Sequence, residues 1–283
     1  MESQSVYTGN EDSEIVRIGR QNEYLNRVAA PYLDEVFAAC VHPAVLDVGC
    51  ADGKSIVERL GGRDYAFLLG IDKNPQKIAA ANERLADERK AFLCLDVETD
   101  AVVEDLRRVL DDRNRTGFDV IHVASALLHM QDVQQVLDRL YGLLVPGGWL
   151  FIQDEDDGFN MIYPHDDSFD DCFYAWDHSL ESGDRAMGRK IPYMLQKSGY
   201  EDIRVLSTTI NSTDFNGEMK ETLWDLYFNS DLWAADDPSF YDNEEAYRRF
   251  LAYRERHAAL REAYRRGEFF AMIGFLYMTA RKK

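Results

Sequence analysis

Apolar residues follow two patterns along the chain, short continuous runs and regular spacing, which together predict alternating strands and helices. Short, almost purely apolar runs are typical of strands buried on both faces, and they lie near residues 44–49, 66–71, 91–95, 118–124 and 148–153. Apolar residues at intervals of three and four predict amphipathic helices between them, near 53–60, 75–88, 100–112 and 132–144. Such alternation implies parallel strands joined by right-handed crossovers. The pattern therefore predicts an α/β domain with a doubly wound, mostly parallel sheet, which binds ligands at the carboxyl ends of its strands.

Segments of different character flank this pattern. Residues Glu14 to Cys40 predict one or two helices, and the acidic segment 154–184 predicts a loop or a short helical insert. Further on, a helix that ends at Gly199, a strand near 200–210, two helices within 214–266 and a last strand at Phe269–Ala280 are expected. We therefore predict an N-terminal helical segment or lid (1–40), a sheet domain (41–212 and 267–283) and a helical insertion before the last strand that acts as an acceptor lid (213–266).

The composition narrows the classes of protein to consider. The chain has 283 residues, with 32 Lys and Arg against 51 Asp and Glu, and a formal net charge of −19. Such a surface repels phosphate backbones, and the sequence shows no basic patch, so we expect no nucleic-acid partner. We find no C-x-x-C pair, no basic and apolar leader and no run of 18 apolar residues. We therefore expect a cytoplasmic protein that does not bind a membrane. The sequence does not decide its oligomeric state, and a homodimer is one possibility.

The segment Val45 to Lys54 (VLDVGCADGK) ends the first predicted strand in a glycine turn. Gly49 and Gly53 permit a tight turn and a close approach of the backbone to a ligand. About twenty residues later, Asp72 ends the next strand, where a carboxylate can accept hydrogen bonds from two ribose hydroxyls. The glycine spacing is not the G-x-G-x-x-G of nicotinamide sites, and no P-loop pattern is present. An adenosyl ligand without a pyrophosphate fits this pattern better.

Several patches, in order, resemble the class I S-adenosylmethionine-dependent methyltransferases. Residues 47–53 (DVGCADG) are similar to the family's D-x-G-C-G-x-G turn, with Ala51 in place of the middle glycine, a change that matters if the position needs φ > 0. Residues 118–130 (FDVIHVASALLHM) resemble its fourth strand and the turn that follows, and 143–152 (LLVPGGWLFI) the segment that turns into the fifth. The resemblance covers roughly 44–153. It implies a seven-stranded sheet whose last strand is antiparallel, and S-adenosyl-L-methionine as cofactor.

The resemblance also implies roles for residues around that cofactor. The turn would approach the methionine moiety, Asp72 would hold the ribose, and Asp96 would meet the adenine, with a helix-capping role as its alternative. Asp47 would lie beneath the turn, and the end of the fourth strand would line the methyl side. The predicted cofactor-binding residues are Asp47, Gly49, Cys50, Ala51, Gly53, Asp72, Lys73, Asp96, Val97, Val123 and Ala124.

The residues that act on the acceptor are less sharply defined. His129, after the fourth strand, and His165, in the acidic segment, are candidate general bases, and each has a hydrogen-bonding loop role as its alternative. The run Asp154–Asp157 is open to three interpretations: a solvated loop, a site for a cationic or amine acceptor, or a divalent metal site. We take His129, His165 and Asp154 as the catalytic candidates and expect no metal.

The sequence thus predicts a methyltransferase that acts on a small-molecule acceptor, because neither a basic patch nor an appended recognition domain points to a macromolecule. Two alternatives stay open. One is a regulatory protein that binds the cofactor without turnover, and the other is a non-methylating reaction, such as decarboxylation or cyclisation, on the same fold.

Overall fold

The computed structural model describes residues 11–180, 183–213, 217–228 and 237–283. Tertiary contacts divide the chain into two compact units. The sheet unit comprises residues 26–155, 186–208 and 275–283, and the helical unit comprises 1–25, 156–185 and 209–274. Three elements contribute residues to both units: α1 (Glu11–Ala38), β7 (Glu201–Asn211) and β8 (Phe270–Arg281).

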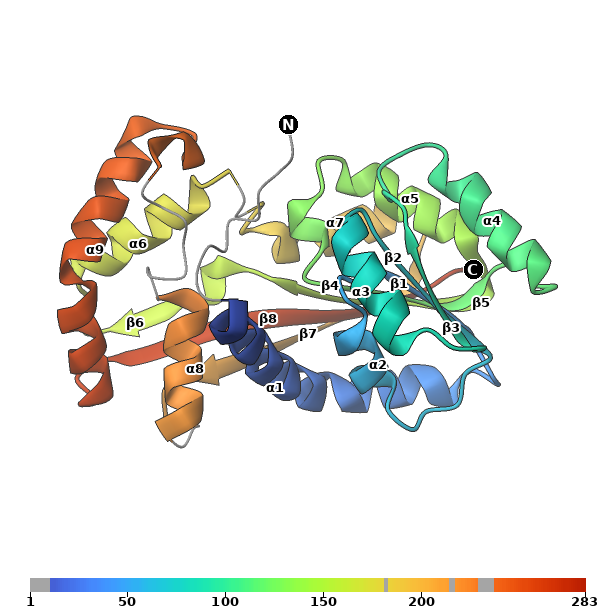
Figure 1. Ribbon diagram of the computed structural model, residues 1–283, viewed down its shortest axis with the longest axis horizontal. Helices are drawn as coiled ribbons and strands as arrows, with labels where there is room; N and C mark the ends of the chain where they lie inside the picture. Colours follow the sequence, from blue (N-terminus) through green and yellow to red (C-terminus); the bar gives the residue numbers. More distant parts are fainter. Residues whose placement is uncertain (1–10, 181–182, 214–216, 229–236) are drawn as a thin grey trace. The chain divides into compact units, whose positions relative to one another are not determined.

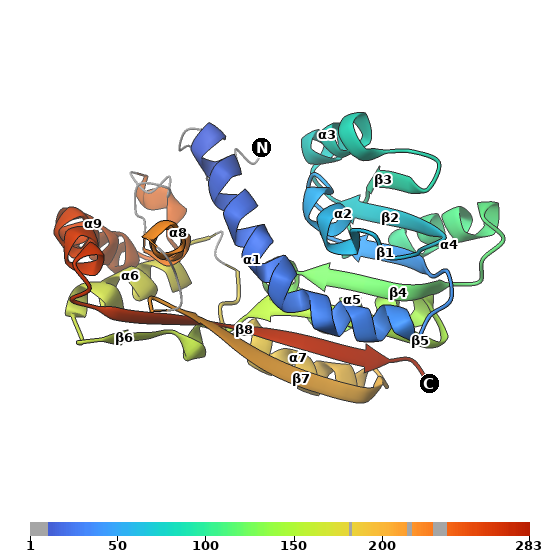
Figure 2. The same ribbon diagram turned by 90° about the horizontal axis from the view of Figure 1, so that it is seen from below.

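The sheet unit alternates strands and helices as the apolar pattern predicts. Its own elements are β1 (Ala44–Val48), α2 (Lys54–Leu60), β2 (Phe67–Asp72), α3 (Pro75–Leu85), β3 (Lys90–Cys94), α4 (Val102–Asp112), β4 (Phe118–Ala124), the 3-10 turn η1 (Leu127–His129), α5 (Val133–Leu143), β5 (Leu144–Glu155) and α7 (Met187–Lys197). The strand order β3-β2-β1-β4-β5-β8, with β7 paired to β8, can be followed in Figure 2. Strands β1 to β5 are parallel and β8 is antiparallel to β5, so the predicted doubly wound sheet is confirmed.

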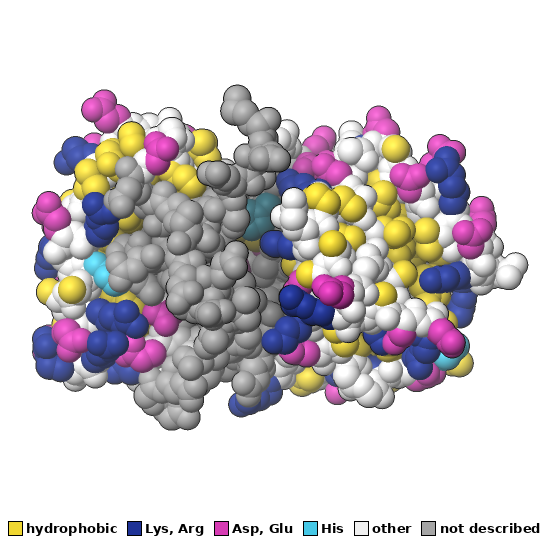
Figure 3. Space-filling model, viewed as in Figure 1, with side chains coloured by type: hydrophobic (Ala, Val, Ile, Leu, Met, Phe, Trp, Pro, Cys, Tyr) yellow, Lys and Arg dark blue, Asp and Glu magenta, His cyan; other side chains and the backbone are white. Residues whose placement is uncertain are grey.

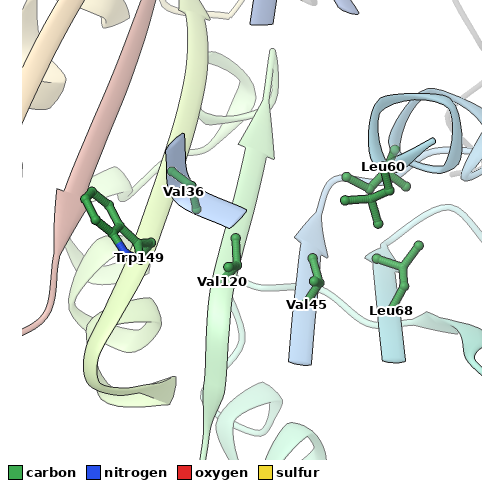
Figure 4. Packing of buried hydrophobic residues seen from close by; sticks show 7 residues of the cluster. Val36, Val45, Leu60, Leu68, Val120 and Trp149 are labelled. Carbon is green, nitrogen blue, oxygen red and sulfur yellow. The ribbon is translucent and has the colours of Figure 1, made fainter. Parts of the chain in front are cut away.

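One face of this sheet packs under α1 and α2. Val45, Leu68 and Val120 point from three neighbouring strands to the same side and meet Val36 of α1 and Leu60 of α2, as Figure 4 shows. All five side chains are almost wholly buried. Because alternate residues of a strand face opposite sides, Leu46 and Ile121 point to the other face, where they are equally buried. Burial on both faces explains why these strands are apolar throughout.

The helical unit contains the remaining described elements, which are η2 (Asp157–Phe159), β6 (Met161–Tyr163), α6 (Asp167–Asp177), α8 (Gly217–Tyr227), η4 (Pro238–Phe240) and α9 (Glu244–Arg265), labelled in part in Figure 1. Its core is aromatic: Phe169 of α6 packs edge-on against Trp224 and Phe228. The Trp224 indole N–H also donates to His257 Nε2 at 3.2 Å. These side chains therefore form the packed core between the helices of this unit.

Several boundaries differ from the sequence-based prediction. The N-terminal segment is one helix, α1, which includes Pro31. Gly147 and Gly148 lie inside β5, not in a turn before it, and Gly147 has a φ of 75°. β5 runs on to Glu155, so the start of the acidic segment is strand, and α6 and the short extra strand β6 follow. The described residues thus form an eight-stranded sheet where seven strands were predicted.

Several surface charges form ion pairs. Figure 3 shows basic side chains next to acidic ones on one face. In α9, for example, Arg261 and Arg265 both reach Glu221 of α8, at 2.9 and 2.7 Å. Among the described residues, no helix combines the length and the apolar character that crossing a membrane requires.

Candidate cofactor and acceptor site

The glycine turn follows the carboxyl end of β1, and three of its residues have a left-handed backbone conformation. Gly49, Ala51 and Gly53 have φ values of 74°, 50° and 74°. The Gly49 and Cys50 N–H groups both donate to the Ile71 carbonyl of β2, at 2.9 and 3.0 Å. A Cβ on Gly49 would lie 2.7 Å from that of Ala126, in the turn after β4. The turn is therefore fastened to β2 and lies directly against the end of β4.

Ala51 occupies a backbone conformation that favours glycine, so the departure from the family pattern carries strain. A left-handed L-residue costs about 1–2 kcal/mol, part of which is offset by the lower backbone entropy of alanine in the unfolded chain. We expect Ala51→Gly to raise the free energy of unfolding by about 0.5–1 kcal/mol, as urea denaturation would measure. Ala79→Gly, on the exposed side of α3, should lower it by about 1 kcal/mol. A decrease for Ala51→Gly would contradict the strain argument.

Asp72 lies at the carboxyl end of β2, half-buried beside the turn. Its Oδ2 accepts the Ala51 N–H at 2.9 Å and its Oδ1 accepts the Asn74 N–H at 2.8 Å. A carboxylate has about four lone-pair positions, so two backbone donors leave capacity for hydroxyl donors of a ligand. Its neighbour Lys73 is exposed. Asp72 can thus hold the turn and a ribose at the same time.

Some of the remaining predicted cofactor residues could contact a ligand only through backbone atoms. Cys50 and Val123 are buried, and the Cys50 side chain packs against Phe92, so only their backbones are available. Burial raises the pKa of the Cys50 thiol, which stays protonated. Asp96 Oδ1 accepts the Glu98 N–H at 2.9 Å in a turn before α4, whose N-cap residue is Ala101, so Asp96 does not cap that helix. Val97 is buried and Ala124 is half-buried.

The three catalytic candidates lie in different local surroundings. His129 is exposed at the end of η1. His165 is an exposed residue of the helical unit, bonded to Asp167 at 3.1 Å and 3.6 Å from Asp170, a trio that could also hold a metal ion. Asp154 is fully buried in β5, where its Oδ1 accepts the Glu155 N–H. Their catalytic roles stay predictions.

The acidic run itself is not a solvated loop. Asp154, Glu155 and Asp156 are all at most 8% exposed. In the helical unit, Arg185 donates to both carboxylate oxygens of Asp157, at 3.0 and 2.8 Å. The guanidinium also lies over the Trp176 ring. The interpretation of these acidic residues as a solvated loop is therefore wrong, because they are buried or paired with an arginine.

A buried polar network beneath the turn was not predicted. Arg59 of α2 is its hub: Nη1 donates to His122 Nε2 at 3.0 Å, Nη2 donates to Gln153 Oε1, and Nε donates to Asn26 Oδ1 at 2.6 Å. His122 Nδ1 lies 2.6 Å from Asp47 Oδ1. Arg59, His122, Gln153 and Asp47 are all at most 4% exposed. Asp47, two residues before Gly49, is therefore buried and held by an imidazole, and its role towards the cofactor stays a prediction.

The position of the proton on the His122 ring follows from the hydrogen bond that Arg59 donates to it. Arginine can only donate, so His122 Nε2 must accept, and the imidazole proton lies on Nδ1, where it donates to Asp47. Burial lowers the pKa of His122, and the Arg59 charge acts in the same direction, so the ring is neutral. No spacing in the sequence marks these residues as a group: His122 lies in β4, Gln153 in β5 and Arg59 in α2, and each of these elements holds other polar residues as well.

The comparisons with known proteins agree with this geometry. A family model described as a methyltransferase domain matches residues 46–150. Carboxy-S-adenosyl-L-methionine synthase of Chromohalobacter salexigens is 34% identical over 114 residues, which cover 39% of this chain and 39% of that protein. Trans-aconitate 2-methyltransferase of Methylobacterium radiotolerans is 27% identical over 158 residues, which cover 56% and 54%. The chain thus spans about two fifths to one half of the length of these curated relatives.

The solved structures show the fold. The crystal structure of an S-adenosylmethionine-dependent methyltransferase from Archaeoglobus fulgidus has a TM-score of 0.51 and 14% identity, covering 92% of this chain and 94% of that one. The matched segment of the family model begins in β1 and ends in β5, so it contains the glycine turn, Asp72, Asp96 and the turn after β4. Residues 46–150 of this chain therefore form a methyltransferase domain.

Proposed function

We propose that this protein transfers a methyl group from S-adenosyl-L-methionine to a small-molecule acceptor. The observation that carries the proposal is the left-handed turn Gly49–Gly53 with the Asp72 carboxylate beside it, at the carboxyl ends of adjacent parallel strands. Backbone without Cβ atoms suits the close approach of a ligand, and a half-buried carboxylate suits a ribose diol.

The cofactor supplies an activated methyl sulfonium when it is bound. The residues of this chain then have two tasks, to hold the adenosyl and methionine parts and to align the acceptor with the methyl carbon. The turn and Asp72 would hold the first, and Asp96 with Val97 would flank the adenine. The end of β4, at Ala124, would face the methyl side, where β4 and β5 pair side by side (Ala124 opposite Gln153).

A small acceptor is supported by two observations. The charge of −19 disfavours nucleic acid, and one relative carries the name of a methyltransferase for trans-aconitate, a small molecule. The assignment of 1–40 and 213–266 to lids over the acceptor remains a prediction.

Titration calorimetry with S-adenosylmethionine, S-adenosylhomocysteine and NAD tests the cofactor assignment. Micromolar binding of the two adenosyl ligands and none of NAD is the expected result. Failure of both adenosyl ligands to bind would remove the proposed function.

Asp72→Asn should weaken S-adenosylhomocysteine binding by roughly 10- to 100-fold, because hydrogen bonds to a charged group contribute about 1.5–3 kcal/mol. The amide keeps the size of the side chain, and its oxygen can still accept the Ala51 N–H, while the Asn74 N–H loses its acceptor. Circular dichroism of the variant would therefore check that it is folded. Asp64→Asn, on an exposed aspartate that pairs with His42, is the control and should leave the affinity unchanged. Equal affinities of the two variants, measured by calorimetry, would exclude Asp72 from the site.

A second candidate function rests on the similarity to carboxy-S-adenosyl-L-methionine synthase. In that case the protein would convert the adenosyl cofactor itself. Mass spectrometry of the ligand released from the purified protein distinguishes the two functions, because a modified adenosyl compound would favour this one.

A further inference from the structure

We propose that Glu155 is the catalytic proton acceptor of this enzyme and that its acceptor substrate is an amine. This inference rests on the proposed methyl transfer and names the substrate class for the same site. Its basis is a directed chain of hydrogen bonds that starts at Arg59 and ends at the Glu155 carboxylate. The chain passes through Gln153 and Ser125.

The direction of each hydrogen bond is fixed by chemistry. Arg59 has only donors, so the Gln153 amide must turn its oxygen to the guanidinium. The Gln153 NH₂ group then faces the Ser125 hydroxyl, with Nε2 3.4 Å from Oγ. Since Oγ accepts there, its own proton is left to donate to Glu155 Oε1, also at 3.4 Å. The chain therefore directs a hydrogen-bond donor to the Glu155 carboxylate.

The chain ends on the side of the sheet unit where a methyl group would lie. Ser125 is the first residue after β4, and the next residue, Ala126, is the one whose Cβ lies against Gly49 of the glycine turn. Ser125 has a φ of 47°, an uncommon conformation for a residue other than glycine and one that recurs at functional sites. It is fixed by its N–H, which donates to the Gln153 carbonyl at 2.8 Å.

Strand geometry separates Glu155 from the neighbouring Asp154. Successive residues of β5 point to opposite faces of the sheet, so Gln153 and Glu155 share a face, and Asp154 points to the other. The hydrogen bonds of Gln153 and Glu155 to the same Ser125 hydroxyl agree with this alternation. Glu155 is 8% exposed and lies at the carboxyl end of its strand, where ligands of such sheets bind.

An amine is the acceptor that such a carboxylate fits. An anionic group attracts an ammonium ion, and an ammonium must lose a proton before its nitrogen can attack. In the proposed step, R–NH₃⁺ gives one proton to Glu155, and the nitrogen lone pair forms the bond to the methyl carbon. The sulfur–methyl bond breaks with its electron pair left on sulfur, which gives S-adenosylhomocysteine and R–NH₂–CH₃⁺. The proton then passes from Glu155 to water.

Sinefungin tests this inference without knowledge of the acceptor, because it is an adenosyl ligand that carries an amine where the cofactor carries its methyl sulfonium. Calorimetry would compare sinefungin with S-adenosylhomocysteine on the wild type, Glu155→Gln and Glu104→Gln. Glutamine at 155 still accepts the Ser125 proton and removes only the charge. Glu104 is an exposed residue of α4 and serves as the matched control.

We expect Glu155→Gln to lower the affinity for sinefungin about tenfold or more and to leave that for S-adenosylhomocysteine within about twofold. Ser125→Ala, which keeps the carboxylate and removes its donor, should lower sinefungin affinity about threefold and provides a second variant if the first does not fold. An unchanged ratio of the two affinities in either folded variant would overturn the role of Glu155. A wild type that binds neither ligand would instead overturn the proposed function.

Discussion

Replacement of Arg59 by methionine is expected to lower the free energy of unfolding by about 3–5 kcal/mol, the range for removing one partner of a buried charged network. The guanidinium donates to three side chains from three other elements: His122 of β4, Gln153 of β5 and Asn26 of α1. Methionine fills a similar volume but donates no hydrogen bond, so buried acceptors lose their partner. The Asp47 carboxylate also loses the nearest buried positive charge. Urea unfolding at pH 7 measures the change.

Arg108→Met is the matched control, because it makes the same chemical change on the exposed surface of α4. Arg108 forms ion pairs with Glu104 and Asp105, and its side chain is 65% exposed. Pairs of this kind contribute about 0.2–1 kcal/mol. If the two variants lost similar amounts of stability, the network would contribute no more than a surface ion pair. Removing the Arg59 charge takes away one cause of the lowered pKa of His122, so the ring should gain a proton beside Asp47 at a higher pH in the variant than in the wild type. Burial still opposes this protonation, so the loss of stability should shrink only at a pH below the ordinary pKa of histidine.

The sheet could be predicted from the sequence because its strands are buried on both faces. Val45, Leu46 and Val48 are all almost wholly buried, and a strand of this kind reads as a continuous apolar run. The end of β5 could not be predicted in the same way. Asp154 and Glu155 are residue types that are depleted in strands, and the pairing of β5 with β8, through Asp154–Leu276 and Glu155–Phe275, overrides that preference.

The cofactor turn could be predicted because its chemistry is local, whereas the polar network could not. Glycine, alanine and aspartate at fixed spacing define the turn within one short segment. Arg59, Gln153 and the pair His122 and Ser125 come from three separate parts of the chain, and no sequence spacing links them. Only the fold shows that they share one set of hydrogen bonds. His129 was predicted from its residue type and its place after the fourth strand, and the residue is exposed.

Gly53→Ala is expected to lower the free energy of unfolding by about 3 kcal/mol, through two separable effects. The first is conformational, because Gly53 has a φ of 74° and an L-residue in this region costs about 1–2 kcal/mol. The second is steric. A Cβ at this position would lie 2.5 and 2.8 Å from two ring atoms of Phe92, closer than carbon atoms can pack. Phe92 has little room to move, because the same ring lies against Gly70 of β2 and is 1% exposed.

Gly62→Ala separates the two effects, since Gly62 follows α2 with a φ of 81° and a Cβ there would meet nothing within 4 Å. It should cost only about 1 kcal/mol, and the difference between the variants measures the contact with Phe92. The same pair distinguishes folding from function: Gly53→Ala should also weaken S-adenosylhomocysteine binding, because the turn must shift to make room, whereas Gly62→Ala should not. Equal losses of stability would mean that Phe92 adjusts freely. The close packing of the turn on this ring would then be no reason for glycine at position 53.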